Sequence, residues 1–464
     1  MNPTETASSA YDTIRTQKTI FGHPAGLFVL SSTEMWERFN YYGMRSLLIL
    51  YLTDFLIKGF RSGTVSILGF ATLQRGIEAV FGPMNIQPLA SQIYGIYTAL
   101  VYLTPLFGGM LADRVLGQRK TVIIGAIVMA IGEFMMTQPS LFLIAMLFLI
   151  LGNGCFKPNI TTQVGSLYRP GDSRRDRAFT FFYVAFNFGA FLSPLICGTL
   201  GQKLGWGYGF AAAGVGMIVG LIIYLSGQRY LADDLLKQRE KAHVEKTPLN
   251  PKERSAIIGL VVLCSINVIF WAVYEQQGNT LQLFADRNTD WHIFGFEMPS
   301  TWLQAFNPLC MFFLFPILNA FWSWQARRGA ELPSVSKMAI GCTLLGLSFL
   351  PLVYLVKGLG PDQKISFLWL FWSTLVLTIG ELCLSPIGLS LVTKVAPARL
   401  ASMLMGVWFL SNFFGNYLTG YLGTFYEKMS RDSFFLMLAA LAVGAGLAMF
   451  ALNKPLKKAV GHDT

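Results

Sequence analysis

The sequence has little charge. Only 13% of its 464 residues are Asp, Glu, Lys or Arg, whereas 53% are apolar. A soluble globular protein carries about 25% charged residues. Because so few charges cannot cover a chain of this length in water, the composition predicts a polytopic membrane protein. The same composition excludes a disordered chain and a disulfide-rich secreted scaffold.

Several kinds of chemical site are also missing. No GxxxxGK[ST] phosphate loop occurs, which excludes an ATP-driven pump. The four histidines lie outside the apolar runs, and the six cysteines stand singly within them. We therefore expect reduced cysteines, no metal, no cofactor and no buried imidazole relay. No clustered nucleophile indicates an enzyme, and the polar N-terminus shows no signal peptide.

The apolar residues form twelve runs that are long enough to cross a bilayer. In lipid the backbone must satisfy its own hydrogen bonds, so runs of about 20 apolar residues predict helices. The short alternating strands of a membrane barrel are absent from the sequence. The predicted spans cover residues 27–56, 91–112, 121–137, 141–163, 177–199, 208–228, 255–284, 302–325, 336–356, 365–394, 400–426 and 433–453.

The basic residues predict the orientation of these spans. With the N-terminus in the cytoplasm, 24 of the 36 Lys and Arg residues lie on the cytoplasmic side and nine lie outside. This positive-inside bias places both termini in the cytoplasm and the protein in the cytoplasmic (inner) membrane. The net charge of +11 then reflects topology, and we expect no nucleic-acid partner.

The longest polar stretch separates the sixth and seventh spans. It divides the chain into an N-terminal six-helix bundle (1–227), a cytoplasmic linker (228–254) and a C-terminal six-helix bundle (255–464). This layout is that of the major facilitator fold, in which substrate binds between the halves near the bilayer midplane. A second connection, residues 58–90, is expected to lie outside and to contain a short amphipathic helix.

The first span carries an unusual stripe of polar residues. Glu34, Glu37, Arg38, Tyr41 and Arg45 fall on one face of a helix, and the spacing of Glu34 and Arg38 suits an i, i+4 ion pair. A charge at membrane depth costs about 2.5–3.5 kcal/mol on insertion scales. The stripe is either a salt-bridge cluster that fixes helix packing or a proton site. We favour the proton site, because Ser or Asn would join helices at a smaller cost.

The other buried charges are spread over both halves. Lys157 lies beside Gly154 and Pro158 in the fourth span, Glu275 lies in the seventh and Glu381 in the tenth. Both signs of charge in one cavity suit a zwitterionic ligand, and the same charges could pair with each other as gates. For Glu133, in the third span, a neutral packing role is the favoured interpretation.

Six motifs together resemble the proton-dependent oligopeptide transporters, a branch of the major facilitator superfamily. The resemblance covers nearly all spans, and the chain departs from most bacterial members by lacking an apolar run for two extra helices between the halves. The motifs are ExxERFxYYGMR (Glu34–Arg45), GGMLADRVLGQRKTV (Gly108–Val122), GNGCFKPNI (Gly152–Ile160), FYVAFNFGAF (Phe182–Phe191), FWAVYEQQG (Phe270–Gly278) and GELCLSPIGLSLVTKVAP (Gly380–Pro397).

The resemblance implies a role for each matching residue. Glu34, Glu37 and Arg38 correspond to the proton-coupling triplet of the family, and Glu275 is a fourth proton-coupling candidate. For the peptide, it implies Arg45 and Lys157 at the carboxylate, Glu381 with Asn187 and Asn307 at the amino terminus, Tyr41, Tyr42 and Tyr102 at the backbone, and Trp271, Trp408, Ser411 and Asn412 as pocket walls. It also implies gate salt bridges between Arg45 and Glu275 and between Lys157 and Glu381, and a cytoplasmic brace at Asp113 and Arg114.

The expected function is a proton-coupled symporter that imports di- and tripeptides by alternating access. Its partners are peptides, protons and membrane lipid, and the functional form is expected to be a monomer. The first alternative is a carrier of the same fold for nitrate, an amino acid or an organic acid. The second is a membrane-embedded enzyme or a channel.

Overall fold

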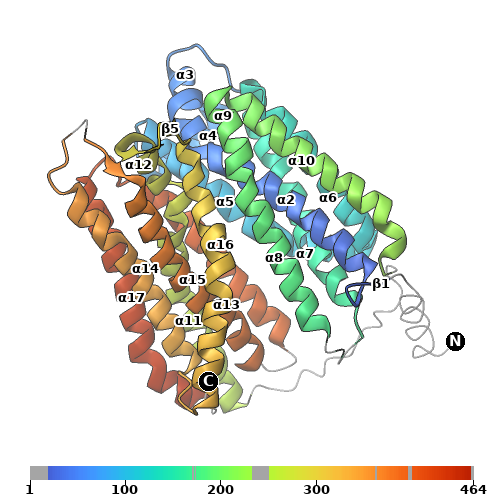
Figure 1. The fold of residues 1–464 in the computed structure, drawn as a ribbon. Coiled ribbons are helices and arrows are strands. Elements are labelled where there is room, and N and C mark those ends of the chain that lie inside the picture. The colour runs from blue at the N-terminus through green and yellow to red at the C-terminus, as the bar shows by residue number, and fades with distance from the viewer. Residues whose placement is uncertain are drawn as a thin grey trace. The chain divides into compact units, whose positions relative to one another are not determined.

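A computed structural model describes residues 19–169, 172, 174–232, 250–360, 363–395 and 400–460 of the chain. The described chain is mainly helical, as the sequence predicts (Figure 1). Its residues form two compact units, each with its own set of packed helices. Unit 1 contains Met1–Tyr51, Lys58–Ala71 and Leu103–His243, and unit 2 contains Leu52–Ile57, Thr72–Tyr102 and Val244–Thr464.

Unit 1 is built around α2, which packs against α8 and α10, while α6 packs against α7 and α10. Short π-helical or 3-10 segments continue several of these helices. The helices that lie within unit 1 are α2 (Ala25–Leu50), α6 (Gln118–Met136), α7 (Phe142–Ser166), α8 (Arg174–Ser193), α9 (Thr199–Lys203) and α10 (Trp206–Gly227). The turns are η2 (Ala112–Leu116), η3 (Pro139–Leu141), η4 (Pro194–Gly198) and η5 (Gln228–Tyr230).

Unit 2 is built around α14, which packs against α15 and α17, while α11 packs against α16 and α17. Its helices are α11 (Pro251–Tyr274), α12 (Thr280–Asn288), α13 (Leu303–Arg327), α14 (Ser334–Val356), α15 (Phe367–Val395), α16 (Ala401–Gly423) and α17 (Arg431–Val460). The turns η6 (Glu275–Gly278) and η7 (Ser300–Trp302) complete the set, whereas η1 (Tyr51–Leu56) has Tyr51 in unit 1 and its other residues in unit 2. Three further helices contribute residues to both units: α3 (Ile57–Arg61), α4 (Phe70–Phe81) and α5 (Ile86–Leu111).

Extended structure in the described residues is limited to three two-stranded pairings. The strands are β1 (Thr19–Ile20), β2 (His23–Pro24), β3 (Thr289–Asp290), β4 (His292–Ile293), β5 (Phe296–Glu297) and β6 (Ile365–Ser366). β1 and β2 pair antiparallel, as do β4 and β5, whereas β3 and β6 pair in parallel. These pairs lie at helix ends and do not change the all-α fold class.

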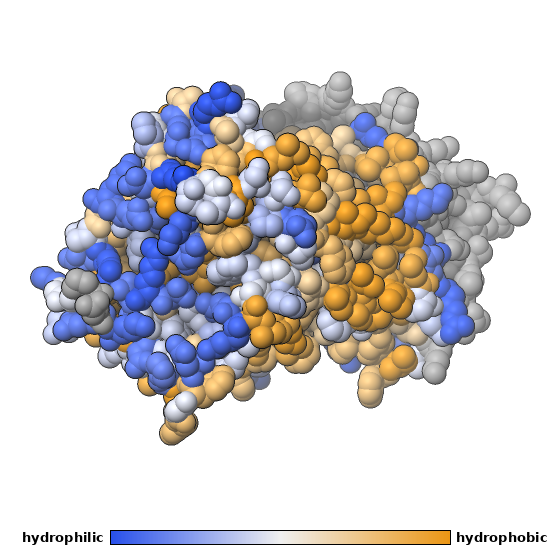
Figure 2. All heavy atoms as spheres, turned by 90° about the horizontal axis from the view of Figure 1, so that it is seen from above, coloured by the Kyte–Doolittle hydropathy of each residue, from blue (hydrophilic) through white to orange (hydrophobic). Residues whose placement is uncertain are grey.

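Within the described ranges, nine helices are long and apolar enough to cross a membrane. The other three predicted spans correspond to α2, α6 and α16, which are also long helices. α2 is long enough to cross a membrane but less apolar than the nine, because it carries the charged residues Glu34, Glu37, Arg38 and Arg45. Most of its residues are nevertheless buried. Figure 2 shows broad areas of hydrophobic residues on the molecular surface, as expected for a protein that faces lipid.

Two glycines let helices of unit 1 approach each other closely where the polar residues lie. A Cβ atom on Gly189 of α8 would overlap the carbonyl of Met35 on α2, next to Glu34. A Cβ atom on Gly108 of α5 would overlap the carbonyl of Gly154 on α7, three residues before Lys157. Small residues allow such close packing of membrane helices. These glycines therefore determine how near α8 and α7 lie to their neighbours.

The connection between the first two spans contains the expected amphipathic helix, α4, in which Phe70 and Ile77 are buried. Residues 233–249 of the expected linker lie outside the described residues. Arg119 at the start of α6 donates through Nε to the carbonyl of Ala232 at 3.0 Å and so holds the chain that follows α10.

Candidate functional site: buried charges in two helical units

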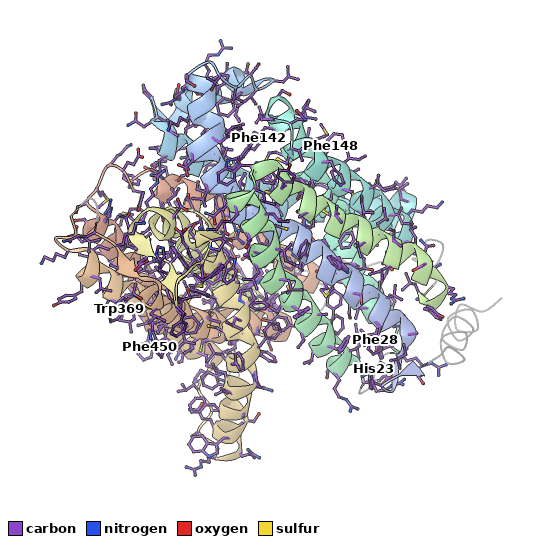
Figure 3. The ribbon with its side chains drawn as sticks, turned by 45° about the horizontal axis from the view of Figure 1, so that its top comes forward. His23, Phe28, Phe142, Phe148, Trp369 and Phe450 are labelled. Carbon is purple, nitrogen blue, oxygen red and sulfur yellow. The ribbon has the colours of Figure 1, made fainter. Side chains whose placement is uncertain are left out.

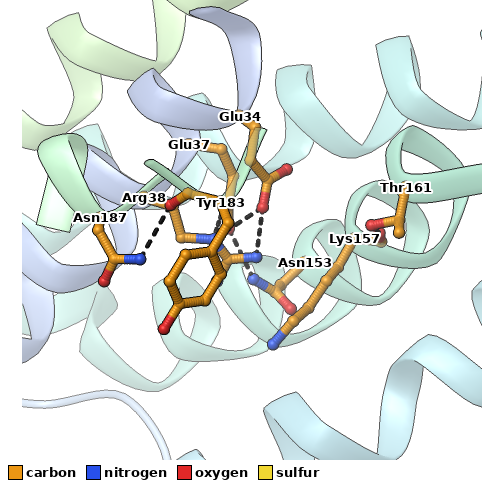
Figure 4. Close-up of polar contacts among 8 residues, drawn as sticks. All are labelled: Glu34, Glu37, Arg38, Asn153, Lys157, Thr161, Tyr183 and Asn187. Carbon is orange, nitrogen blue, oxygen red and sulfur yellow. Dashed lines mark hydrogen bonds and ion pairs between the residues drawn. The ribbon is translucent and has the colours of Figure 1, made fainter. Parts of the chain in front are cut away.

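Three ionisable side chains of α2 form a compact ion cluster in unit 1 (Figure 4). Arg38 Nη2 lies 2.7 Å from Glu34 Oε1, and Arg38 Nε lies 3.1 Å from Glu37 Oε2. The exposed fractions are 2% for Glu34, 0% for Glu37 and 7% for Arg38. The i, i+4 spacing in the sequence therefore produces the pair it predicts. Charge-assisted hydrogen bonds of this kind are about twice as strong as neutral ones.

A side chain from α7 completes the cluster. Asn153 Nδ2 donates a hydrogen bond of 3.0 Å to Glu37 Oε1, and Asn153 is itself buried. Lys157 lies one helical turn after Asn153, so the two share a face of α7 (Figure 4). The coupling candidates of α2 and the Lys157 candidate thus belong to one unit and one region of it.

Aromatic side chains lie against the two arginines of α2. The Arg38 guanidinium lies 5.7 Å from the ring centre of Phe186 on α8, and Arg45 lies 5.7 Å from the ring centre of Tyr42. Tyr42 in turn contacts Tyr41 edge to face at 5.2 Å. Such contacts stabilise a cation where water is excluded.

The remaining unit 1 candidates occupy separate helices. Asn187 on α8 is 6% exposed and donates to the carbonyl of Tyr183 at 2.9 Å, one turn earlier in the same helix. Tyr102 lies in α5, at the end of the part of that helix that belongs to unit 2.

In unit 2, two side chains hold the carboxylate of Glu381 on α15. Tyr274 at the end of α11 donates its hydroxyl to Glu381 Oε2 at 2.6 Å. Asn307 on α13 donates through Nδ2 to the same oxygen at 3.0 Å and also lies 3.1 Å from Thr378 Oγ1. The predicted pair of Glu381 and Asn307 therefore comes together, and donors from two helices orient the carboxylate of a third.

The aromatic and amide candidates of unit 2 lie on α11 and α16. Asn267 Nδ2 donates to Ser411 Oγ at 2.8 Å, and Ser411 donates to the carbonyl of Trp408 at 2.6 Å. Trp408 is 1% exposed, and its ring lies where a Cβ atom of Gly388 would be. Asn412 is buried as well, and its Oδ1 receives no hydrogen bond from the described residues.

The chain leaves the regular α-helix at Glu275. α11 ends at Tyr274, and Glu275 begins the tight turn η6 with an exposed fraction of 1%. Gln276 in this turn donates to the carbonyl of Thr419 at 3.0 Å, which holds η6 against α16. Glu275 and Glu381 belong to unit 2, whereas Arg45 and Lys157 belong to unit 1.

A polar contact connects the chain before α2 with the chain after α7. His23, in β2 immediately before α2 (Figure 3), lies with Nδ1 2.8 Å from the Tyr168 hydroxyl. Partial burial, Arg174 and Arg177 lower the pKa of His23. Burial raises the pKa of Tyr168 to about 12, and hydrogen bonds from Arg174 lower the pKa of Asp172 to about 2.

Glu133 and the cysteines lie outside these clusters. Glu133 is 0% exposed, and neither carboxyl oxygen receives a hydrogen bond from the described residues. All six cysteines are free thiols, five of them buried. In the described part of the chain, no group of three or more His, Cys, Asp or Glu side chains is placed to hold a metal ion.

Sequence reasoning missed two residues that the structure brings into these clusters. Asn153 stands within the GNGCFKPNI motif, four residues before Lys157, and this spacing alone indicates a shared face. Tyr274 stands within FWAVYEQQG, between the two residues of that motif that the sequence predicts for the site, Trp271 and Glu275. No local pattern connects Tyr274 with Glu381, since 107 positions separate them.

Comparison with known proteins identifies the family to which the chain belongs. The POT family model matches residues 119–247 and 230–440, which together span well over half of the chain. The chain belongs to the POT family. The resemblance to proton-dependent oligopeptide transporters is thereby confirmed, and the protein is a multi-pass membrane transporter, not an enzyme.

Two curated relatives match nearly the whole chain. An uncharacterized transporter, YclF of Bacillus subtilis, is 33% identical over 96% of this chain and 96% of its own. A di-/tripeptide transporter of Lactococcus lactis subsp. cremoris is 30% identical over 96% of this chain and 98% of its own. A third, the peptide transporter YePEPT of Yersinia enterocolitica, is 32% identical over 88% of each chain.

Solved POT structures share the fold. A point mutant of the peptide transporter POT, in complex with alafosfalin, superposes with a TM-score of 0.83 at 29% identity, over 98% of this chain and 99% of its own. A POT family transporter in complex with 5-aminolevulinic acid gives a TM-score of 0.81 at 28% identity, over 96% and 99%. The major facilitator fold predicted from the count of spans is confirmed.

Proposed function

We propose that this protein is a proton-coupled symporter that imports di- and tripeptides across the cytoplasmic membrane by alternating access. The observation that carries the proposal is the buried cluster of two carboxylates around one guanidinium on α2. The names of its relatives, which include peptide and di-/tripeptide transporters, support the choice of substrate.

The charge of the cluster explains why it suits proton coupling. When Glu34 and Glu37 are both ionised, Arg38 balances only one of them. A second charge must be neutralised in a buried site, and either a proton or another cation can do this. Lys157, one turn from Asn153, is the cation we propose to share this role. The cluster then changes its partners when a proton binds, which makes protonation and conformation interdependent.

The remaining candidates bind different parts of the peptide. In the proposal, Arg45 and Lys157 receive the carboxylate of the peptide, and Glu381 receives its ammonium with help from Asn187 and Asn307. Tyr41, Tyr42 and Tyr102 hydrogen-bond its backbone. The proposed walls for its side chains are Trp271, Trp408, Ser411 and Asn412.

Transport then follows from competition for these charges. In the proposal, Arg45 pairs with Glu275 and Lys157 pairs with Glu381 in different states of the cycle. The termini of a bound peptide compete for the same partners, so peptide binding weakens one set of ion pairs. The transporter can then change between its outward-facing and inward-facing states. The halves are residues 1–227 and 255–464, joined by a linker at 228–254, with both termini in the cytoplasm. The protein acts as a monomer without a cofactor, driven by the proton gradient.

The test is uptake by proteoliposomes that contain the purified protein. An inward proton gradient should drive accumulation of labelled dialanine, and tripeptides should compete whereas tetrapeptides should not. Uptake that ignores the gradient, in the unmodified protein and in Glu37→Gln alike, overturns the coupling. Competition by nitrate or 5-aminolevulinic acid without competition by tripeptides would instead assign a small anion or zwitterion as substrate.

A further inference from the structure

Tyr274 is the donor closest to the Glu381 carboxylate among the hydrogen bonds we describe. Its hydroxyl lies 2.6 Å from Glu381 Oε2, compared with 3.0 Å for Asn307 Nδ2 on the same oxygen. Tyr274 is 8% exposed. A phenol at this distance from a carboxylate forms a short, charge-assisted hydrogen bond.

The two donors come from different helices and fix one oxygen of the carboxylate. Tyr274 reaches Glu381 from the end of α11, and Asn307 reaches it from α13. Asn307 is itself positioned by Thr378, whose hydroxyl donates to the carbonyl of Thr374 at 2.7 Å. A carboxylate offers about four acceptor positions, more than these two donors occupy. Both of these donors are neutral, so neither of them cancels the charge of the carboxylate.

Tyr274 also forms one wall of an aromatic cluster that has an unused donor. Its ring stacks on Phe270 at 5.8 Å and contacts Trp271 edge to face at 5.3 Å. Trp271 is 7% exposed, and its indole N–H finds no acceptor among the described residues. Buried donors in proteins almost always have a partner. The unpartnered N–H beside Tyr274 therefore indicates that a ligand brings an acceptor to this place.

We propose that Tyr274 is a positioning residue that orients Glu381 for the primary ammonium group of the substrate, with the Trp271 N–H beside it for a neighbouring carbonyl oxygen. This inference rests on the proposed function and adds a determinant of specificity. The preferred ligand has a free ammonium group next to a carbonyl, as at the amino end of a peptide. Loss of the Tyr274 hydroxyl should weaken binding of such ligands and leave analogues without the ammonium group unaffected.

Tyr274→Phe tests the inference, with Tyr224→Phe as a matched control. Tyr224 is fully buried in unit 1 and donates to Gln163 Oε1 at 2.9 Å, so Tyr224→Phe also removes one buried hydroxyl. For dialanine we expect Tyr274→Phe to raise KM by about 2- to 12-fold, the equivalent of one hydrogen bond, with kcat unchanged. The inhibition constant of propionyl-alanine, which lacks the ammonium group, should stay constant. Tyr224→Phe should change neither value.

A double-mutant cycle separates positioning from a general effect on the fold. If Tyr274 acts through Glu381, adding Tyr274→Phe to Glu381→Gln should cause much less additional loss of dialanine binding than it does alone. Dialanine binding to the purified protein, measured by calorimetry, supplies this readout even for variants that do not transport. The inference is overturned if dialanine and propionyl-alanine weaken equally, or if the two substitutions act independently.

These outcomes differ from those that would overturn the proposed function. An unmodified protein that neither binds nor accumulates dialanine removes the peptide substrate and this inference with it. A protein that accumulates dialanine normally, with Tyr274→Phe indistinguishable from Tyr224→Phe, overturns only the role of Tyr274.

Discussion

In unit 1 two buried carboxylates share one guanidinium, whereas in unit 2 the Glu381 carboxylate accepts hydrogen bonds from the neutral side chains of Tyr274 and Asn307. The guanidinium balances only one of the two negative charges when both carboxylates are ionised. A proton or another cation must then balance the second negative charge. Neutral donors orient a carboxylate but leave its charge in place.

The difference suggests a division of labour between the units. A cluster that is one positive charge short can respond to protons, because a single protonation event completes its balance. A carboxylate that is oriented in advance can receive a cationic group with little reorganisation. We therefore expect substitutions in the α2 cluster of Glu34, Glu37 and Arg38 to affect coupling to the gradient, and substitutions at Glu381 and its two donors to affect affinity for the substrate.

The largest expected effect is that of Glu37→Gln in unit 1. Glutamine keeps the hydrogen bond from Asn153 but cannot exchange a proton, so accumulation of dialanine against its concentration gradient should disappear. Counterflow of dialanine between equal pH values should persist, since the substitution leaves the peptide candidates intact. Restored accumulation at low external pH would contradict the role of Glu37.

Arg38→Met should affect stability more than any other single change in the cluster. Breaking a buried ion pair by removing one partner costs about 3–5 kcal/mol in the free energy of unfolding. The loss should lessen at low pH, because protonation neutralises Glu34 and Glu37. Thermal unfolding in detergent measures it. Arg287→Gln is the control, since its pair with Asp54 is about two-fifths exposed and should contribute about 1 kcal/mol or less.

Glu381→Gln should act on affinity and not on coupling. Hydrogen bonds to charged groups contribute about 1.5–3 kcal/mol, so KM for dialanine should rise about 10- to 150-fold. Whatever uptake remains should still require the proton gradient. Glu133→Gln provides a matched exchange of a buried Glu in unit 1, and it should leave KM unchanged. An equal rise in KM in both variants would show that the exchange of any carboxyl group among the helices raises KM, and would remove the distinctive role of Glu381.

Asn153→Ala should move the pH dependence of uptake by a smaller amount. A donor to a carboxylate favours its ionised form, so its loss lets Glu37 hold a proton at higher pH. The midpoint of uptake should therefore shift toward alkaline pH. The control is Asn159→Ala on the same helix, because the Asn159 amide donates to the carbonyl of Cys155 within α7 and not to a carboxylate of the cluster. A shift toward acidic pH would contradict the sign of this argument.

His23→Gln should have the smallest effect. Because its pKa is lowered, His23 is neutral at neutral pH and becomes charged only on acidification. Its contribution to stability is present at neutral pH and is lost as the pH falls. Hydrogen exchange at residues 19–24 should therefore lose its acid sensitivity in the variant. The pH midpoint of dialanine uptake should stay constant, and a clear shift would move the proton-sensing role away from the α2 cluster.

Much of the site could be predicted where it depends on one helix. Glu34, Glu37 and Arg38 lie on consecutive turns of α2, so their spacing alone predicts the ion pair that forms. Asn153 needed the packing of α7 against α2 before its contact with Glu37 became visible. The same is true of Tyr274 and Glu381, whose helices are distant in the sequence.

The sequence by itself determined the class of protein and the number of spans. A low charge content and long apolar runs permit few other solutions, because lipid requires a helix for each run. It also identified most of the buried charges and, through their motifs, the POT family, although Lys157 and Glu381 are only partly buried in the structure. Only the tertiary structure decided which neutral polar side chains donate hydrogen bonds to those charged side chains. Hydrogen bonds from Asn153, Tyr274 and Asn307 depend on how separate helices approach one another, and no local pattern specifies that approach.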